Sequence, residues 1–134
     1  MDDEPAAVSG FKSKSGWRRL LRAWGYSRAG LKAAWRGEHA FRQEMYAFVP
    51  AALVALLLPL AALEKLLLIG VLVLVLIVEL INSAIEAAID RVSLERHPLS
   101  KAAKDFGSAA VLLACLLALA TWSVLLWPWL FGDA

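Results

Sequence analysis

Five polar side chains in the middle of the sequence are spaced so that they could share one face of a helix. They are Glu79, Asn82, Ser83, Glu86 and Asp90. Steps of three or four residues bring side chains to the same side of an α-helix. Carboxylates in or near a membrane span are costly unless they are partnered or hydrated. One such residue could simply form a hydrogen bond between helices, but a stripe of them beside a basic region indicates a catalytic site.

The depth of each group along this helix suggests its chemistry. A poorly hydrated carboxylate is a stronger base, so the deepest one, Glu79, suits the removal of a proton from an alcohol. The alternative is a protonated Glu79 that forms an interhelical hydrogen bond. Glu86 is two turns nearer to water and suits Mg²⁺, which usually binds one or two carboxylates and phosphate oxygens. Asn82 lies between the two and could orient either.

A phosphoryl transfer is one reaction that these groups could serve. Lys104, together with arginines of the N-terminal region, could neutralise charge on a transferring phosphoryl group. The sequence contains neither GxxxxGK[ST] nor GxGxxG. Nucleotide binding would therefore use neither the P-loop nor the protein-kinase apparatus.

The elements that must position these residues are membrane helices of a single domain spanning residues 1–134. Hydrophobic residues make up 60% of the chain, and the mean hydropathy is +0.63. We expect an all-α membrane protein with transmembrane helices at 45–63, 66–89 and 106–130. Pro59 should kink or end the first span, and Ser100 could cap the helix that enters the last one. Three spans shield a polar stripe poorly, so we expect a homo-oligomer.

The N-terminal region predicts a short disordered tail at 1–10 and an amphipathic surface helix at 11–36, with a possible break at Gly25 or Gly30. Bulky apolar residues follow a helical spacing of i, i+3, i+4 and i+7: Trp17, Leu20, Leu21 and Trp24. The segment from Lys12 to Arg36 contains eight bases and no acid. Such a helix lies in the membrane interface, as a plain anchor or as a binder of anionic ligands. The interleaved Trp and Leu argue against nucleic acid as a partner.

The distribution of bases predicts the orientation in the membrane. Nine of the 14 Lys and Arg residues precede the first span, four lie between Arg91 and Lys104, and only Lys65 lies in the other connection. By the positive-inside rule the N-terminus is cytoplasmic and the turn at 64–65 is outside. The polar half of the second span then faces the cytoplasm, where nucleotide is available.

Three blocks of the sequence resemble the prokaryotic diacylglycerol kinase family, and the resemblance covers about residues 17–131. The blocks are Glu38-x-Ala40-Phe41-Arg42-Gln43-Glu44, then Val78-Glu79-x-x-Asn82-Ser83-Ala84-Ile85-Glu86 with Asp90-Arg91, and Lys104-Asp105-x-Gly107-Ser108-Ala109-Ala110-Val111. Gly37 departs from the pattern, because an Asn is common there.

The resemblance implies a homotrimeric bacterial inner-membrane kinase, each subunit having a surface helix and three spans. It implies transfer of the γ-phosphate of ATP, with Mg²⁺, to the primary hydroxyl of diacylglycerol. Glu79 would be the general base that also contacts the lipid, Ser108 a second lipid-site residue, and Glu38 and Glu86 the metal ligands. The nucleotide-site positions would be Arg19, Tyr26, Asn82, Glu86, Glu95, His97, Lys104 and Asp105.

The role of Glu38 comes from the resemblance alone. Its spacing predicts an ordinary exposed carboxylate paired with Arg42 at i+4. Two alternatives to a diacylglycerol kinase stay open at this point. One is an undecaprenol kinase, because related proteins phosphorylate that polyprenol; the other is a small non-enzymatic membrane protein, such as a transporter subunit or an assembly partner.

Overall fold

The computed structural model describes residues 16–132, which form four helices. They are α1 (Gly16–Gly37), α2 (His39–Leu57), α3 (Ala62–Val92) and α4 (Pro98–Phe131). The predicted tail at 1–10 and the first residues of the predicted surface helix, 11–15, lie outside the described residues. The all-α class is confirmed. By length and composition α2, α3 and α4 are each able to cross a membrane.

The chain divides into two units, residues 1–33 and 34–134. The described part of the first unit is helical throughout, so neither Gly25 nor Gly30 breaks α1. Its apolar residues are exposed: Trp17 and Trp24 retain 69% and 68% of their accessible surface. The large apolar side chains of this helix are therefore available for contact with lipid or with another protein chain.

The first span of the second unit ends earlier than expected. The sequence predicts a span at 45–63, whereas α2 begins at His39 and ends at Leu57. Pro59 explains the end, because proline disfavours helical dihedrals in the residue before it, and Leu58 is extended with ψ of 145°. Two side chains then cap the connection: Lys65 Nζ donates to the carbonyl of Leu56 at 2.7 Å, and Glu64 Oε2 accepts from the Ala61 amide at 2.8 Å.

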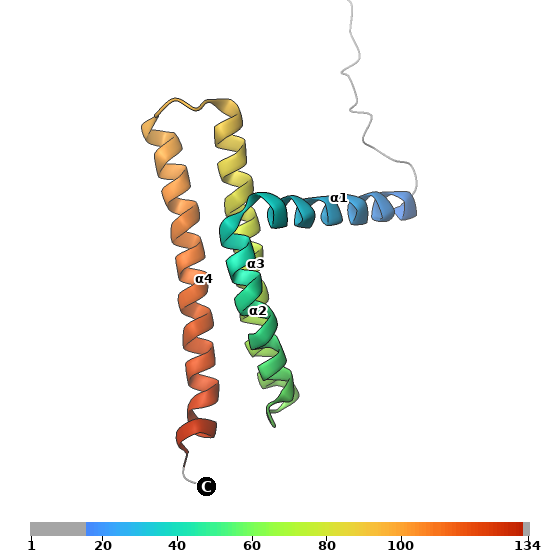
Figure 1. Ribbon diagram of the computed structural model, residues 1–134, viewed down its shortest axis with the longest axis vertical. Helices are drawn as coiled ribbons and strands as arrows, with labels where there is room; N and C mark the ends of the chain where they lie inside the picture. The colour runs from blue at the N-terminus through green and yellow to red at the C-terminus, as the bar shows by residue number, and fades with distance from the viewer. Residues whose placement is uncertain (1–15, 133–134) are drawn as a thin grey trace, which may run out of the picture. The chain divides into compact units, whose positions relative to one another are not determined.

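Helix α3 contacts both α2 and α4, and α3 and α4 run antiparallel (Figure 1). Their common core contains Val75 of α3 and two small residues of α4, Ala114 and Ala118. Small residues allow close approach of helix backbones in a bilayer. Nearer the 58–61 connection, Trp122 Nε1 donates across the pair to the carbonyl of Leu68 at 3.1 Å, and Leu68 is completely buried.

The residue that caps the start of α4 differs from the expected one. The sequence predicts that Ser100 caps this helix. The expected spans are 66–89 and 106–130; the helices α3 and α4 extend beyond these bounds, and residues 93–97 connect them. His97 is the N-cap, and its Nδ1 accepts a hydrogen bond from the Leu99 amide at 3.2 Å. Pro98 follows at the first helical position, where its missing N–H leaves no bond unmade.

Helix lengths allow an estimate of where the polar stripe would lie relative to a bilayer. The 19 residues of α2 extend about 28 Å, close to the ~30 Å of a hydrocarbon core. The 31 residues of α3 extend about 46 Å, so roughly 16 Å lies beyond that core. Counting back from the 58–61 connection, the start of α2 is level with about residue 80 of α3. A hydrocarbon core that coincided with α2 would therefore have its boundary near Glu79, with Glu86 and Asp90 beyond it.

Candidate active site

The polar stripe of α3 changes from buried to exposed along the helix. Glu79 and Asn82 retain only 5% and 8% of their accessible surface, Glu86 is half-buried and Asp90 is exposed. Asn82 Nδ2 donates to Glu86 Oε1 at 3.1 Å, which restrains that carboxylate. Glu79 lies within electrostatic range of Glu86 and also of Glu38. The packing of α2 on α3 thus brings together three of the carboxylates that the sequence singled out.

Glu38 occupies the turn between α1 and α2. It is the N-cap residue of α2, but its side chain makes no capping hydrogen bond. Arg42, its expected partner, instead donates through Nη1 to the carbonyls of Trp35 at 3.0 Å and Arg36 at 3.2 Å. Arg42 therefore closes the turn, and Glu38 is positioned by the turn rather than by pairing with Arg42.

Glu44 is a carboxylate beside the candidate site to which the sequence analysis gave no role. It is half-buried on α2, lies within electrostatic range of Glu79, and its buried Oε2 has no hydrogen-bond partner among residues 16–132. The expected start of the first span at residue 45 placed Glu44 just outside the membrane. Because α2 begins at His39, Glu44 instead lies in its second turn. An acid followed by an apolar run was the signal that could have found it.

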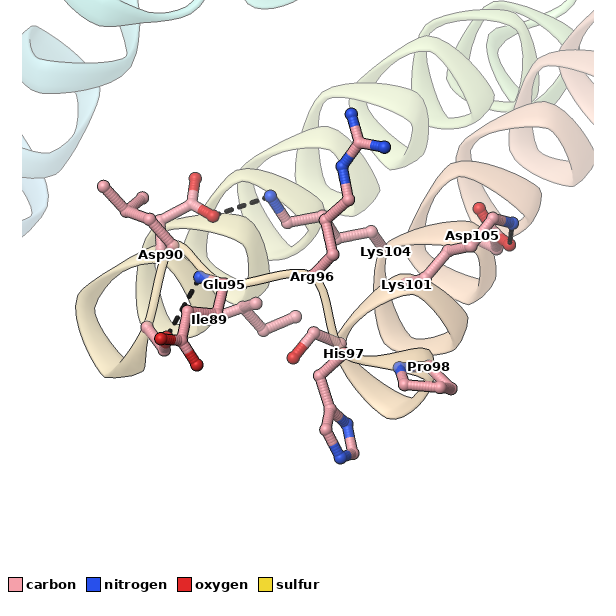
Figure 2. A pocket seen from close by; sticks show the side chains of 12 residues that line it. Ile89, Asp90, Glu95, Arg96, His97, Pro98, Lys101, Lys104 and Asp105 are labelled. Carbon is pink, nitrogen blue, oxygen red and sulfur yellow. Dashed lines mark hydrogen bonds and ion pairs between the residues drawn. The ribbon is translucent and has the colours of Figure 1, made fainter.

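A pocket of about 650 Å³ opens where α3 ends and α4 begins. Figure 2 shows its lining, which includes four of the predicted nucleotide-site residues: Glu95, His97, Lys104 and Asp105. Lys104 Nζ pairs with Asp90 Oδ1 across the two helices at 2.7 Å, and Lys101 pairs with Asp105 at 2.5 Å. The imidazole of His97 points away from Asp90 and Lys104 (Figure 2), as its capping role requires.

Lys104 connects this pocket with the polar stripe. Besides its bond to Asp90, it lies within electrostatic range of Glu86. Arg96 also lines the pocket. Sequence reasoning counted Arg96 only as a charge in a loop, although arginine is well suited to phosphate oxygens. An anion in the pocket would therefore meet cations on its inner wall, close to the carboxylates of α3.

Three further predicted site residues have exposed side chains. Arg19 and Tyr26 are exposed on the part of α1 that belongs to the first unit, and Ser108 is exposed on α4. Their assignments to the nucleotide and lipid sites stay predictions.

The donor set fits a metal ion that arrives with phosphate. Residues 16–132 contain no group of three or more His, Cys, Asp or Glu side chains that could hold a metal by itself. Glu86 and Glu38 nevertheless offer carboxylate oxygens, and Mg²⁺ commonly takes one or two of these and completes its shell with phosphate and water. The site therefore suits Mg²⁺ bound to a nucleotide better than a resident ion held by protein alone.

Comparisons with known proteins agree with this geometry. The family model described as prokaryotic diacylglycerol kinase matches residues 25–126. The diacylglycerol kinase of Pseudomonas aeruginosa is 55% identical over 118 residues, which cover 88% of this chain and 96% of the relative. The diacylglycerol kinase of Escherichia coli K12 is 51% identical over 113 residues, covering 84% of this chain and 93% of the relative. That of Helicobacter pylori strain 26695 is 44% identical over 107 residues, covering 80% and 84%.

Proposed function

Since the chain belongs to the prokaryotic diacylglycerol kinase family, we propose that it phosphorylates diacylglycerol at the membrane interface with Glu79 as the base. The protein is a multi-pass membrane enzyme, and ATP is the phosphoryl donor of a kinase. One observation carries the assignment of the base. Glu79 is a nearly fully buried carboxylate. We infer that it lies at the level of the bilayer boundary, where the hydroxyl of a membrane lipid could reach it.

The proposed reaction is a direct phosphoryl transfer. The primary hydroxyl oxygen of diacylglycerol attacks the γ-phosphorus of ATP and forms a new P–O bond, while the bond to the β–γ bridging oxygen breaks and ADP leaves. Glu79 accepts the hydroxyl proton. Because the lipid oxygen and the γ-phosphate must meet in line, the main task of the protein is to hold both in place.

The residues beyond Glu79 bind the nucleotide end of the reaction. Glu86 and Glu38 would hold Mg²⁺, which when bound offsets the negative charge of the phosphates. Lys104 stands between the pocket and Glu86, so it stabilises charge on the transferring group. The remaining predicted nucleotide-site residues are Arg19, Tyr26, Asn82, Glu95, His97 and Asp105, and Ser108 belongs to the lipid site.

We also propose a homotrimer with the N-terminus and the 93–97 loop in the cytoplasm. The exposed apolar side chains of the α3–α4 pair, among them Ile77, Ile81 and Leu113, are available for contact with lipid or with further copies. A polar stripe in so small a bundle is better shielded by further copies. The orientation is supported by the excess of Lys and Arg on one side.

Purified protein in mixed micelles tests the function directly. With labelled ATP, Mg²⁺ and diacylglycerol, we expect labelled phosphatidic acid. A second reaction contains equimolar undecaprenol, and we expect diacylglycerol to remain the preferred acceptor. Preferential labelling of undecaprenol would replace the proposed substrate, and absence of label from both lipids would overturn the function.

A further inference from the structure

Gly107 of α4 lies directly against the side chain of Asn82 on α3. A Cβ atom built at Gly107 would be 2.0 Å from Asn82 Oδ1 and 3.1 Å from its Cγ. Real Cβ contacts are essentially never shorter than 3.0 Å, so a residue with a side chain does not fit here unless Asn82 moves. Gly107 and Asn82 are both buried. The absence of a side chain at Gly107 is therefore what admits the amide between the two helices.

The two ends of the Asn82 amide have different surroundings. Nδ2 donates to Glu86 Oε1, whereas Oδ1 is buried and has no conventional hydrogen-bond partner among residues 16–132. A Cα–H of Gly107 lies along the direction of the missing Cβ, toward Oδ1. Contacts of this Cα–H···O kind recur at helix–helix interfaces. The opposite amide orientation would turn Oδ1 toward the Glu86 carboxylate and the NH₂ group toward the hydrogen of Gly107, and both contacts are repulsive.

We propose that Gly107 is a positioning residue for Glu86 and acts through Asn82. The Cα–H of Gly107 contacts Asn82 Oδ1. This contact holds the amide in the orientation in which Nδ2 restrains the Glu86 carboxylate. The inference rests on the proposed role of Glu86 in binding Mg²⁺ with the nucleotide. Partners that orient a metal ligand strongly affect metal affinity. Gly107 thus contributes to Mg²⁺ and nucleotide binding although it contacts neither.

The test is Gly107→Ala, with Gly70→Ala as its matched control. Gly70 is also a glycine of a membrane helix, but a Cβ built there meets nothing within 4 Å. For Gly107→Ala we expect the half-saturating Mg²⁺ concentration for phosphatidic acid formation to rise about tenfold. KM for diacylglycerol should stay within about twofold, since the lipid end is untouched. Gly70→Ala should retain wild-type values for both.

Binding measured without turnover separates positioning from a general loss of activity. Mn²⁺ serves as a paramagnetic probe together with a non-hydrolysable ATP analogue, and its bound fraction is read by electron paramagnetic resonance. We expect Gly107→Ala to weaken Mn²⁺ binding by a similar factor. A wild-type Mg²⁺ requirement and wild-type Mn²⁺ binding in Gly107→Ala would overturn the proposal.

A second variant covers the case in which Gly107→Ala folds poorly. Replacing Asn82 by Ala removes the atoms with which the new methyl group collides. The double variant Asn82→Ala/Gly107→Ala should therefore have the thermal midpoint of Asn82→Ala alone. A further fall in the double variant would show that Gly107 serves packing of the helices alone and would overturn the proposal. Failure of the proposed function is distinguishable, because wild type and Gly70→Ala would then form no phosphatidic acid either.

Discussion

The two ends of the α3–α4 pair differ in whether their polar side-chain atoms have hydrogen-bond partners. At the end nearer the 58–61 connection, the indole N–H of Trp122, the ammonium of Lys65 and the carboxylate of Glu64 each have a hydrogen-bond partner on the backbone. At the other end, Asn82 Oδ1, together with Glu44 Oε2 on the neighbouring α2, is buried without a hydrogen-bond partner among residues 16–132.

The difference indicates which end serves stability and which serves function. A buried polar atom without a partner costs about 1–3 kcal/mol. Buried atoms of this kind in proteins are commonly explained by strain, by a catalytic role, or by a bound water or ion. Substitutions near Glu79 should therefore affect turnover more than stability, and substitutions near Trp122 should do the reverse.

The largest effect is expected for Glu79→Gln. Gln cannot accept a proton from the lipid hydroxyl, so kcat should fall by about 10²–10⁴-fold, the usual contribution of a general base. Stability should not decrease, because the substitution removes a charge from a buried position. The measurements are phosphatidic acid formation in mixed micelles and thermal unfolding in the same detergent.

Glu64→Gln is the control for that comparison. It is the same change on the same helix, and the Gln side chain retains an oxygen that can accept the Ala61 N–H. Wild-type activity is expected. If Glu79→Gln also turned over at the wild-type rate, Glu79 would not be the base.

A smaller effect is expected for Glu86→Gln, which retains the size of the side chain but removes its charge. The half-saturating Mg²⁺ concentration should rise at least about tenfold, because a neutral amide is a poorer Mg²⁺ ligand. KM for diacylglycerol measured on the same preparation is the internal control and should hardly change. An unchanged Mg²⁺ requirement would exclude Glu86 as a ligand.

The smallest effect is expected at the opposite end, for Trp122→Phe. Loss of the bond from Nε1 to the Leu68 carbonyl should destabilise the protein by about 1 kcal/mol and leave kcat close to wild type. Denaturation in sodium dodecyl sulfate mixed micelles measures the stability. Trp127→Phe, at a position that is 64% exposed, is the control and should be close to neutral. Loss of turnover without loss of stability in Trp122→Phe would contradict the assignment of the two ends.

The local pattern of the sequence was sufficient for the elements and for one face of the site. The spacing of Glu79, Asn82 and Glu86 predicts a common helix face, and the Asn82–Glu86 hydrogen bond is consistent with it. The long apolar runs predict the three membrane helices. These inferences succeed because helical periodicity relates residues of the same segment, and the sequence contains that information directly.

Contacts between helices were decided only by the tertiary structure. The register in which α2 packs on α3 places Glu44 and Glu38 within electrostatic range of Glu79. The contact of Gly107 with Asn82 likewise depends on how α3 and α4 are aligned. The spacing of residues within one helix carries no information on the axial shift or rotation of that helix relative to its neighbour. Packing decides both, because it must bury small residues against each other and exclude side chains that do not fit.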